Sequence, residues 1–358
     1  MALNLHKLLR TEGKLGQGTK HLRVFEPHPG LFAFYDGRVD GQRFMAGPNW
    51  VDDGALSLGI ASYALLRGDH ALIYDSHVSV PHALAMRAAL EARGARQFTV
   101  VLSHWHLDHV AGTAAFPGCE VIANARTDAH LRGNFAEIQA GTSSGMPVID
   151  PLILPSKVFS GQMVLWLGDL EVHLTQANIH SDDAMVLWLP EARILLAGDT
   201  VEDCVTYVGE PEHFATHLRD LNRLAALGPR FVLPNHGSAG RIAAGGYGPD
   251  ILPATQRYVG WLMGLQAAPE LAETPLRDVI AGDLASGALE WFAPYEDIHR
   301  QNVARTLAHF DHLALCQHQT SRAPAPEPGP RPTEQADVER EAPARGPGRA
   351  GKAAGSDG

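Results

Sequence analysis

The sequence predicts a layered α/β fold in which two β-sheets lie between helices. Short apolar strands alternate with turns from about residue 22 to residue 240, and they fall into two groups along the chain. Helical segments are interspersed among the strands, and a further helical stretch follows them. Because sheets covered by helices are among the few stable layer arrangements, this order indicates a four-layer αββα sandwich with a C-terminal helical extension.

The first group of strands occupies the N-terminal half of this region. Its β-branched and aromatic residues are bounded by turn residues, and Gly68-Asp69 indicates a tight turn between two strands. Strands are expected at 23–25, 31–35, 62–75 (two strands), 99–102 and 121–123. Residues 81–94 are rich in Ala and Leu, which favour helices, so we expect one helix there and another around 127–132.

The second group of strands completes the main body. Pro190-Glu191-Ala192 indicates a turn between two of them. Strands are expected at 172–174, 185–189, 194–197 and 231–233. From residue 253 to residue 317 apolar residues recur at helical spacing, which predicts a helical extension.

These patterns divide the chain into three parts. Residues 20–245 are expected to form the main domain, and residues 246–320 the helical extension. Residues 321–358 are rich in Pro, Gly and Ala, and their low apolar content predicts a disordered tail, because no core offsets the loss of chain entropy. The segment 134–161 is either a loop over a substrate site or a plain surface connection.

Composition limits the partners and the location of the protein. The formal net charge is −11 and the chain lacks a stripe of Lys and Arg, so a long nucleic acid is not an expected partner. No apolar stretch approaches the length of a membrane span. The three cysteines are far apart, and no apolar segment follows Lys7, Arg10 and Lys14 as in a signal peptide. We therefore expect a cytoplasmic protein that acts on a small molecule.

Four side chains of metal-binding type lie within six positions, directly after a predicted strand. They are His104, His106, Asp108 and His109. A loop that leaves a strand can turn all four toward one point without disturbing the sheet. Imidazole and carboxylate together suit zinc, iron or manganese, so the sequence indicates a metal site here.

The run His-x-His-x-Asp-His after a strand resembles the hallmark of the metallo-β-lactamase superfamily. Members of that superfamily have a further His, a bridging Asp and a last His downstream, each at a strand end. His180, Asp199 and His236 occupy these places in order, each beside a predicted strand. The resemblance covers about residues 22–240 and implies an αββα sandwich that holds two metal ions.

The resemblance also implies a role for each ligand. The first metal ion is expected on His104, His106 and His180. The second is expected on Asp108, His109 and His236, with Asp199 as the bridge between the two. The implied cofactors are two divalent ions, zinc or else iron or manganese, which generate a hydroxide nucleophile at neutral pH.

Two carboxylates near these ligands receive roles from the same resemblance. Asp108 is the expected catalytic residue, because its carboxylate accepts a hydrogen bond from the bridging hydroxide and orients it. Asp75 is expected to steady a ligand histidine. A simple turn at the end of its strand is the alternative explanation for Asp75.

The substrate has to be inferred from side chains around the metals, since this fold hosts many reactions. Glu202 stands three residues after Asp199, where similar zinc β-lactamases have Lys and similar lactonases have Tyr. Tyr207 and Tyr247 are nearby candidates to replace that Tyr. A negative charge at Glu202 is expected to repel the carboxylate of a β-lactam. The expected reaction is hydrolysis of an ester-like carbonyl in a neutral or weakly charged lactone, ester or thioester.

Other reactions of the same fold stay open at this stage. A β-lactamase or a phosphodiesterase would use the same metal core. An iron-dependent dioxygenase is a non-hydrolytic alternative, because zinc and iron share nitrogen and oxygen ligands.

Overall fold

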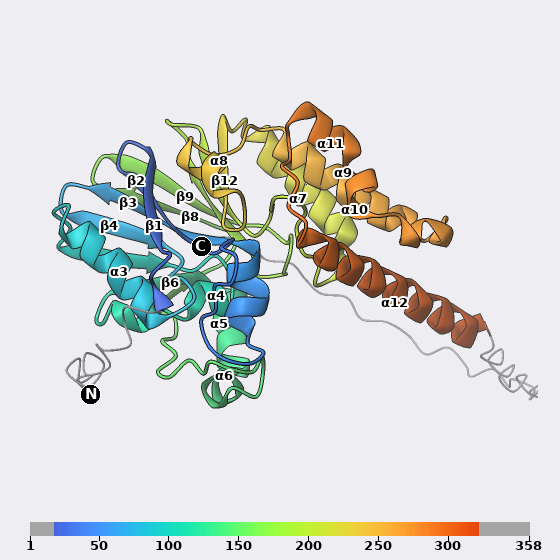
Figure 1. Ribbon diagram of the computed structural model, residues 1–358, viewed down its shortest axis with the longest axis horizontal. Helices are drawn as coiled ribbons and strands as arrows, with labels where there is room; N and C mark the ends of the chain where they lie inside the picture. Colours follow the sequence, from blue (N-terminus) through green and yellow to red (C-terminus); the bar gives the residue numbers. More distant parts are fainter. Residues whose placement is uncertain (1–17, 322–358) are drawn as a thin grey trace, which may run out of the picture. The chain divides into compact units, whose positions relative to one another are not determined.

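The computed structural model describes residues 18–321 (Figure 1). Residues up to Ala314 belong to one compact unit, and a second unit begins at Leu315, of which only the end of helix α12 is described. The tail predicted for residues 321–358 lies outside the described residues apart from Ser321, and so do Lys7, Arg10 and Lys14. The predicted domain boundary near residue 245 stays a prediction.

Two sheets form the centre of the first unit, as predicted. One sheet has seven strands in sequence order: β1 (Arg23–His28), β2 (Leu31–Asp36), β3 (Ile60–Arg67), β4 (His70–Tyr74), β5 (Gln97–Val101), β6 (Glu120–Asn124) and β7 (Lys157–Phe159). The other has five, in the order β12 (Phe231–Pro234), β11 (Ile194–Gly198), β10 (Met185–Leu189), β9 (Leu170–Gln176) and β8 (Gln162–Leu167). Strands β4 to β7 run parallel to one another, as do β11 and β12.

Strand β2 shows how the layers are made. Alternate side chains of a strand point to opposite faces of the sheet. Every residue of β2 is buried, because both faces of the sheet are covered here. Ala33 and Tyr35 pack in the core shared with the second sheet. Phe32 and Phe34 pack in a separate core with the helices on the outer face. A strand buried on both faces reads as a continuous apolar run, as this one does.

Helices cover the outer face of each sheet (Figure 1). The seven-stranded sheet shares its outer core with α3 (Val80–Glu91), α4 (Leu107–Val110), α5 (Ala125–Gly133) and α6 (Phe135–Ala140). Helix α7 (Phe214–Ala226) connects the parallel strands β11 and β12, and it packs with α9 (Ile251–Gly264) into the core of the five-stranded sheet. This is the predicted four-layer αββα arrangement.

Three buried tyrosines join the two sheets. Tyr63 on β3 donates a hydrogen bond to the Pro234 carbonyl at 2.5 Å, and Tyr74 on β4 donates to the Met185 carbonyl at 2.6 Å. Tyr35 on β2 donates at 2.8 Å to the carbonyl of Gly237, the residue that follows His236. Burial raises the pKa of Tyr35 to about 12. These hydroxyls satisfy main-chain carbonyls inside a core that water does not reach.

The C-terminal helices confirm the predicted extension. They are α10 (Leu276–Val279), α11 (Ala281–Ser286) and the long α12 (Tyr295–Ser321). Short helical segments complete the described residues: η1 (Val51–Leu56), η2 (Thr113–Ala115), η3 (Pro211–His213), α8 (Ala239–Ala243) and η4 (Pro269–Glu273). None of the described helices combines the length and the apolar composition that a membrane crossing needs.

Several elements differ from the sequence-based expectation. No element was predicted at α6, α7, β7 or β8. Strand β8 lies at a sheet edge, where Trp166 is 64% exposed, so its pattern mixes exposed and buried apolar residues. The segment 134–161 contains α6 and β7, and its Pro147 carbonyl accepts a hydrogen bond from the Trp50 indole at 2.9 Å.

Candidate metal centre

The first ligand motif lies at the end of β5, where the chain leaves the sheet. His104 and His106 lie in the connection between β5 and α4, and Asp108 and His109 lie in the first turn of α4. His104 and His109 are buried, whereas His106 and Asp108 are partly exposed. The motif is therefore anchored in the protein on one side and open to solvent on the other.

The remaining three predicted ligands come from the five-stranded sheet. His180 lies between β9 and β10 in a left-handed backbone conformation, with φ of 72°. Asp199 follows β11 directly, and His236 comes two residues after β12. Because β11 and β12 are parallel, their carboxyl ends meet at one edge, which brings Asp199 and His236 together.

The structure gathers four of the predicted ligands at a first point. The Nδ1 atom of His106 lies 2.9 Å from Nε2 of His104 and 2.9 Å from Nε2 of His180. The Oδ2 atom of Asp199 lies 3.6 Å from the Nε2 atoms of both His104 and His180. Three imidazole nitrogens and one carboxylate oxygen therefore face a common centre.

The other predicted ligands gather beside this group. The Asp108 carboxylate lies 3.5 Å from Nε2 of His109 and 3.3 Å from Nε2 of His236. Asp199 Oδ2 also lies 3.1 Å from Nε2 of His109 and 3.5 Å from Nε2 of His236. One carboxylate oxygen thus lies between both groups, which is the position of a bridging ligand.

The donor set fits divalent cations. Oδ1 of Asp199 is buried and, among the described residues, has no hydrogen-bond partner. Three imidazole nitrogens that converge on one point cannot all satisfy one another as donor and acceptor, whereas all three can offer lone pairs to a cation. Nitrogen and oxygen donors with two carboxylates suit zinc, iron or manganese.

The electrostatics of the cluster also favour cations. Burial lowers the pKa of His104 well below its ordinary value and that of His106 to about 3, so both are neutral and have a lone pair at neutral pH. Burial acts in the same direction on His236, but Asp199 and Asp108 outweigh it and raise its pKa to about 9. Burial works to raise the pKa of Asp108, but the charges of His109 and His236 hold it well below its usual range. The buried carboxylates thus stabilise positive charge in the cluster. A bound cation can supply that charge in place of protons on the histidines.

Asp75 anchors one side of the cluster. Its carboxylate accepts hydrogen bonds from the Ser103 amide and hydroxyl, each at 2.7 Å, and from the Asn235 side-chain amide at 2.5 Å. His109 Nδ1 lies 2.9 Å from the same carboxylate. Asp75 therefore joins the residues that precede His104 and His236 to His109 itself, which is the supporting role that the sequence suggested.

Glu202 does not lie where the sequence analysis expected it. The prediction that its charge lines the substrate site is wrong, because Glu202 is only 1% exposed. It accepts hydrogen bonds from the Tyr207 amide and the Tyr295 hydroxyl, each at 3.0 Å. Its Oε1 also lies 3.5 Å from Nδ1 of His180. Tyr295, which the sequence analysis missed, lies 93 residues further along the chain at the start of α12, and no local pattern signals this contact.

The two tyrosines proposed near the metals behave differently. Tyr247 is buried, and its hydroxyl donates to Asp203 at 2.8 Å and accepts from the Ser238 amide at 2.7 Å. Tyr207 is partly exposed, and its ring lies 5.7 Å from the ring of His180. Within residues 18–321 the Tyr207 hydroxyl forms no hydrogen bond. Of these two, only Tyr207 is placed to meet a substrate.

A third group of metal-binding side chains lies nearby but is fully engaged. It comprises His130, Asp182 and Asp183. The Asp182 carboxylate lies 2.7 Å from Nε2 of His130, and Asp183 accepts from the Trp105 amide at 2.9 Å. The Trp105 ring stacks on His130. These contacts position the loop that carries His104 and His106.

Comparisons with known proteins agree with this geometry. A family model described as the metallo-beta-lactamase superfamily matches residues 57–236, which include all seven predicted ligands. The atrochrysone carboxyl ACP thioesterase of Aspergillus fumigatus is 28% identical over 184 residues, which is 50% of this chain and 51% of that protein. The chain therefore spans about half the length of the curated relative it matches.

Solved structures show the same fold. A metallo-beta-lactamase from Pontibacter korlensis superposes with a TM-score of 0.50 at 16% identity, over 67% of this chain and 99% of its own. The DIM-1 metallo-beta-lactamase gives a TM-score of 0.50 at 19% identity, over 67% of this chain and 98% of its own. With its two sheets, its outer helices and the match over residues 57–236, the chain has the fold of a metal-dependent hydrolase and belongs to the metallo-beta-lactamase superfamily.

Proposed function

We propose that the protein is a dinuclear metal-dependent hydrolase of ester-like carbonyl compounds, with thioesters as the foremost substrate class. The observation that carries the proposal is the position of Asp199, whose Oδ2 lies 3.1–3.6 Å from four imidazole nitrogens. A single carboxylate between two groups of donors is suited to hold two cations side by side. The two ions proposed are zinc, on His104, His106 and His180 and on Asp108, His109 and His236, with Asp199 shared.

The chemistry expected from the centre is hydrolytic. When bound, paired divalent ions supply a hydroxide at neutral pH and polarise a carbonyl. Asp108 orients the attacking oxygen, because its ionised carboxylate is 17% exposed and accepts a hydrogen bond from it. Burial raises the pKa of Tyr207, against the opposing effect of Arg305, so its hydroxyl stays protonated and donates to the carbonyl oxygen of the substrate as negative charge develops there.

Two observations bear on the substrate class: the name of one relative, and the burial of Glu202. The Aspergillus fumigatus relative is named as a thioesterase, and its similarity covers about half of each chain. Since Glu202 is buried against Tyr295 and Tyr207, its charge gives no reason to exclude anionic substrates. The proposal therefore keeps thioesters, esters and lactones but no longer requires a neutral or weakly charged molecule.

A panel assay tests this proposal. Protein of defined zinc content should hydrolyse at least one thioester, ester or lactone faster than any β-lactam or phosphodiester. The Asp108→Asn variant provides the matched control for contaminating hydrolases. Faster turnover of a β-lactam than of every ester-like compound would contradict the proposal, and oxygen consumption by iron-loaded protein would favour a dioxygenase instead.

Metal content provides an independent test. Elemental analysis of protein purified without chelators should approach two metal ions per chain, one for each group of donors. A saturable maximum of one ion would contradict a dinuclear centre.

The location we propose is the cytoplasm, in keeping with the free thiols of Cys119 and Cys204.

A further inference from the structure

A cationic side chain lies close to the metal-ligand cluster. The guanidinium carbon of Arg305, on α12, lies 4.8 Å from the centroid of the Tyr207 ring. That ring lies 5.7 Å from the ring of His180. Over the part of the chain that the structure describes, Arg305 forms no hydrogen bond and no ion pair, and it is exposed. Its N–H donors are therefore available beside the place where Tyr207 meets a substrate.

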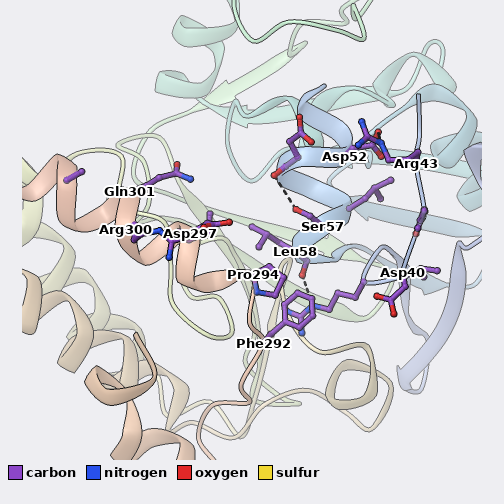
Figure 2. A pocket seen from close by; sticks show the side chains of 18 residues that line it. Asp40, Arg43, Asp52, Ser57, Leu58, Phe292, Pro294, Asp297, Arg300 and Gln301 are labelled. Carbon is purple, nitrogen blue, oxygen red and sulfur yellow. Dashed lines mark hydrogen bonds and ion pairs between the residues drawn. The ribbon is translucent and has the colours of Figure 1, made fainter. Parts of the chain in front are cut away.

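A groove runs along the same helix. Figure 2 shows Asp297, Arg300 and Gln301 on the α12 side and Ser57 and Leu58 on the other. The groove has a volume of about 1010 Å³. That volume is sufficient for a ligand of ordinary metabolite size.

Two residues that line the groove are close in the chain to residues that contact Tyr207 or His236. Gln301 lines the groove, and Arg305 is four residues further along α12, so the two share one helix face a single turn apart. On the opposite wall, Leu58 precedes Gly59, whose carbonyl oxygen lies 2.9 Å from Nδ1 of His236. Arg305 therefore follows the groove-lining part of α12 along the helix, and its guanidinium lies over the Tyr207 ring.

The arginines that line the groove already have partners. Arg43 pairs with an aspartate at 3.1 Å, and Arg300 pairs with Asp297. Arg38 donates to two main-chain carbonyls, at 2.6 and 3.0 Å. Unlike these arginines, Arg305 keeps its charge unneutralised and its donors unused within residues 18–321. Its planar set of donors matches carboxylate and phosphate oxygens.

We propose that Arg305, stacked on Tyr207, binds an anionic oxygen group of the substrate, so that the enzyme prefers acyl compounds that carry a carboxylate or phosphate a few bonds from the reacting carbonyl. This inference rests on the proposed hydrolysis of ester-like carbonyls. Tyr207 contributes by holding the guanidinium in place through a cation–π contact, which restricts the long side chain before the substrate arrives. The selectivity follows from a charge-assisted hydrogen bond that a neutral acyl chain cannot form.

The test compares matched substrates and matched variants. Glutaryl and valeryl thioesters of the same thiol differ in a terminal carboxylate, and a 3-phosphonopropionyl thioester provides the phosphate-like arm. Wild-type protein should show the higher kcat/KM on one or both anionic substrates. In Arg305→Gln the ratio of anionic to neutral kcat/KM should fall about 10- to 100-fold, as expected when a hydrogen bond to a charged group is lost. Arg277→Gln is the control, because Arg277 also stacks on an aromatic ring, Trp291, but in another helix.

Direct binding separates this proposal from the proposed function. Calorimetry with glutarate and 3-phosphonopropionate should show binding to zinc-loaded wild-type protein and to Arg277→Gln, and at least tenfold weaker binding to Arg305→Gln. A carboxylate-only or a phosphonate-only response identifies which anion the site takes. If no ester is hydrolysed but this binding pattern holds, the proposed function fails and the anion site stands. An unchanged substrate ratio in Arg305→Gln, together with equal anion binding in all three proteins, would overturn the anion site.

Discussion

The two carboxylates that support the metal-ligand cluster differ in how they are built. Asp75, Ser103 and Asn235 each lie just beyond the end of a strand, and the Asp75 carboxylate accepts hydrogen bonds from the other two. His109, in the first turn of α4, lies 2.9 Å from the same carboxylate. Glu202 lies 3.5 Å from His180 and is held by Tyr295 from a helix 93 residues away. The first support follows from the sandwich alone, because parallel strands bring their carboxyl ends to one edge. The second depends on the C-terminal extension, so changes in α12 can alter the centre without altering the sandwich.

The largest loss of activity is expected from a substitution inside the cluster itself, at Asp108. Asp108→Asn should keep the fold but lower kcat about 10²–10⁴-fold, because it removes a ligand charge and the acceptor that orients the attacking oxygen. The measurements are turnover, metal content and the thermal unfolding midpoint. Near wild-type turnover with full metal content would show that Asp108 has neither role.

The Asp75 support should be the more sensitive of the two. In Asp75→Asn an amide donor replaces an acceptor that faces Ser103, His109 and Asn235. We expect metal affinity to fall toward the upper end of the 10- to 100-fold range typical of such outer partners. The free energy of unfolding should fall by about 1–3 kcal/mol, because a buried polar group loses its partner. Metal titration and urea unfolding measure the two effects.

The Glu202 support should give a smaller effect of the same kind. Glu202→Gln should weaken metal binding about tenfold, at the lower end of that range, because its contact with His180 is longer. Tyr295→Phe should weaken it less, since Glu202 keeps its hydrogen bond from the Tyr207 amide. Glu191→Gln, at an exposed position, is the control and should change neither the metal affinity nor the free energy of unfolding. Equal losses of metal affinity in Asp75→Asn and Glu202→Gln would show that the two carboxylates support the cluster equally.

A pH effect on stability, separate from the two supports, concerns the buried His217 on α7. Burial lowers the pKa of His217 to about 4, and neither of its ring nitrogens has a hydrogen-bond partner among the described residues. The folded state therefore resists protonation that the unfolded chain accepts below its ordinary pKa. The contribution of His217 to stability should be complete above pH 6.5 and be lost as the pH falls toward 4, by about 3 kcal/mol at most.

His217→Phe isolates this contribution. The variant keeps a flat ring in the same space, so it should lose stability less steeply than wild-type protein between pH 6.5 and 4. Urea unfolding at a series of pH values gives the two slopes. Parallel slopes would mean that His217 does not titrate with unfolding.

The sequence predicted the sandwich from local patterns, and it predicted the place of the cluster from one local motif together with the resemblance to the metallo-β-lactamase superfamily. Apolar runs bounded by turns marked most of the strands, and His104, Asp199 and His236 each follow a strand closely enough to be placed at its end. Residues whose roles depend on packing between distant elements could not be placed in this way. Glu202 was expected at the substrate because its spacing from Asp199 was known, whereas its burial against Tyr295 depends on α12. Arg305 looks like any exposed helical arginine until Tyr207 and His180 are seen beside it.

The three tyrosines that join the sheets link the centre to folding itself. His104 follows a strand of the seven-stranded sheet and Asp199 follows a strand of the five-stranded one, so the complete cluster exists only while the two sheets are docked through their shared core and through Tyr35, Tyr63 and Tyr74. A cation that binds this cluster binds only the docked state, and by mass action it shifts the docking equilibrium in proportion to the logarithm of its free concentration. The supply of the proposed divalent ions would thus act on the amount of folded protein as well as on the proposed reaction.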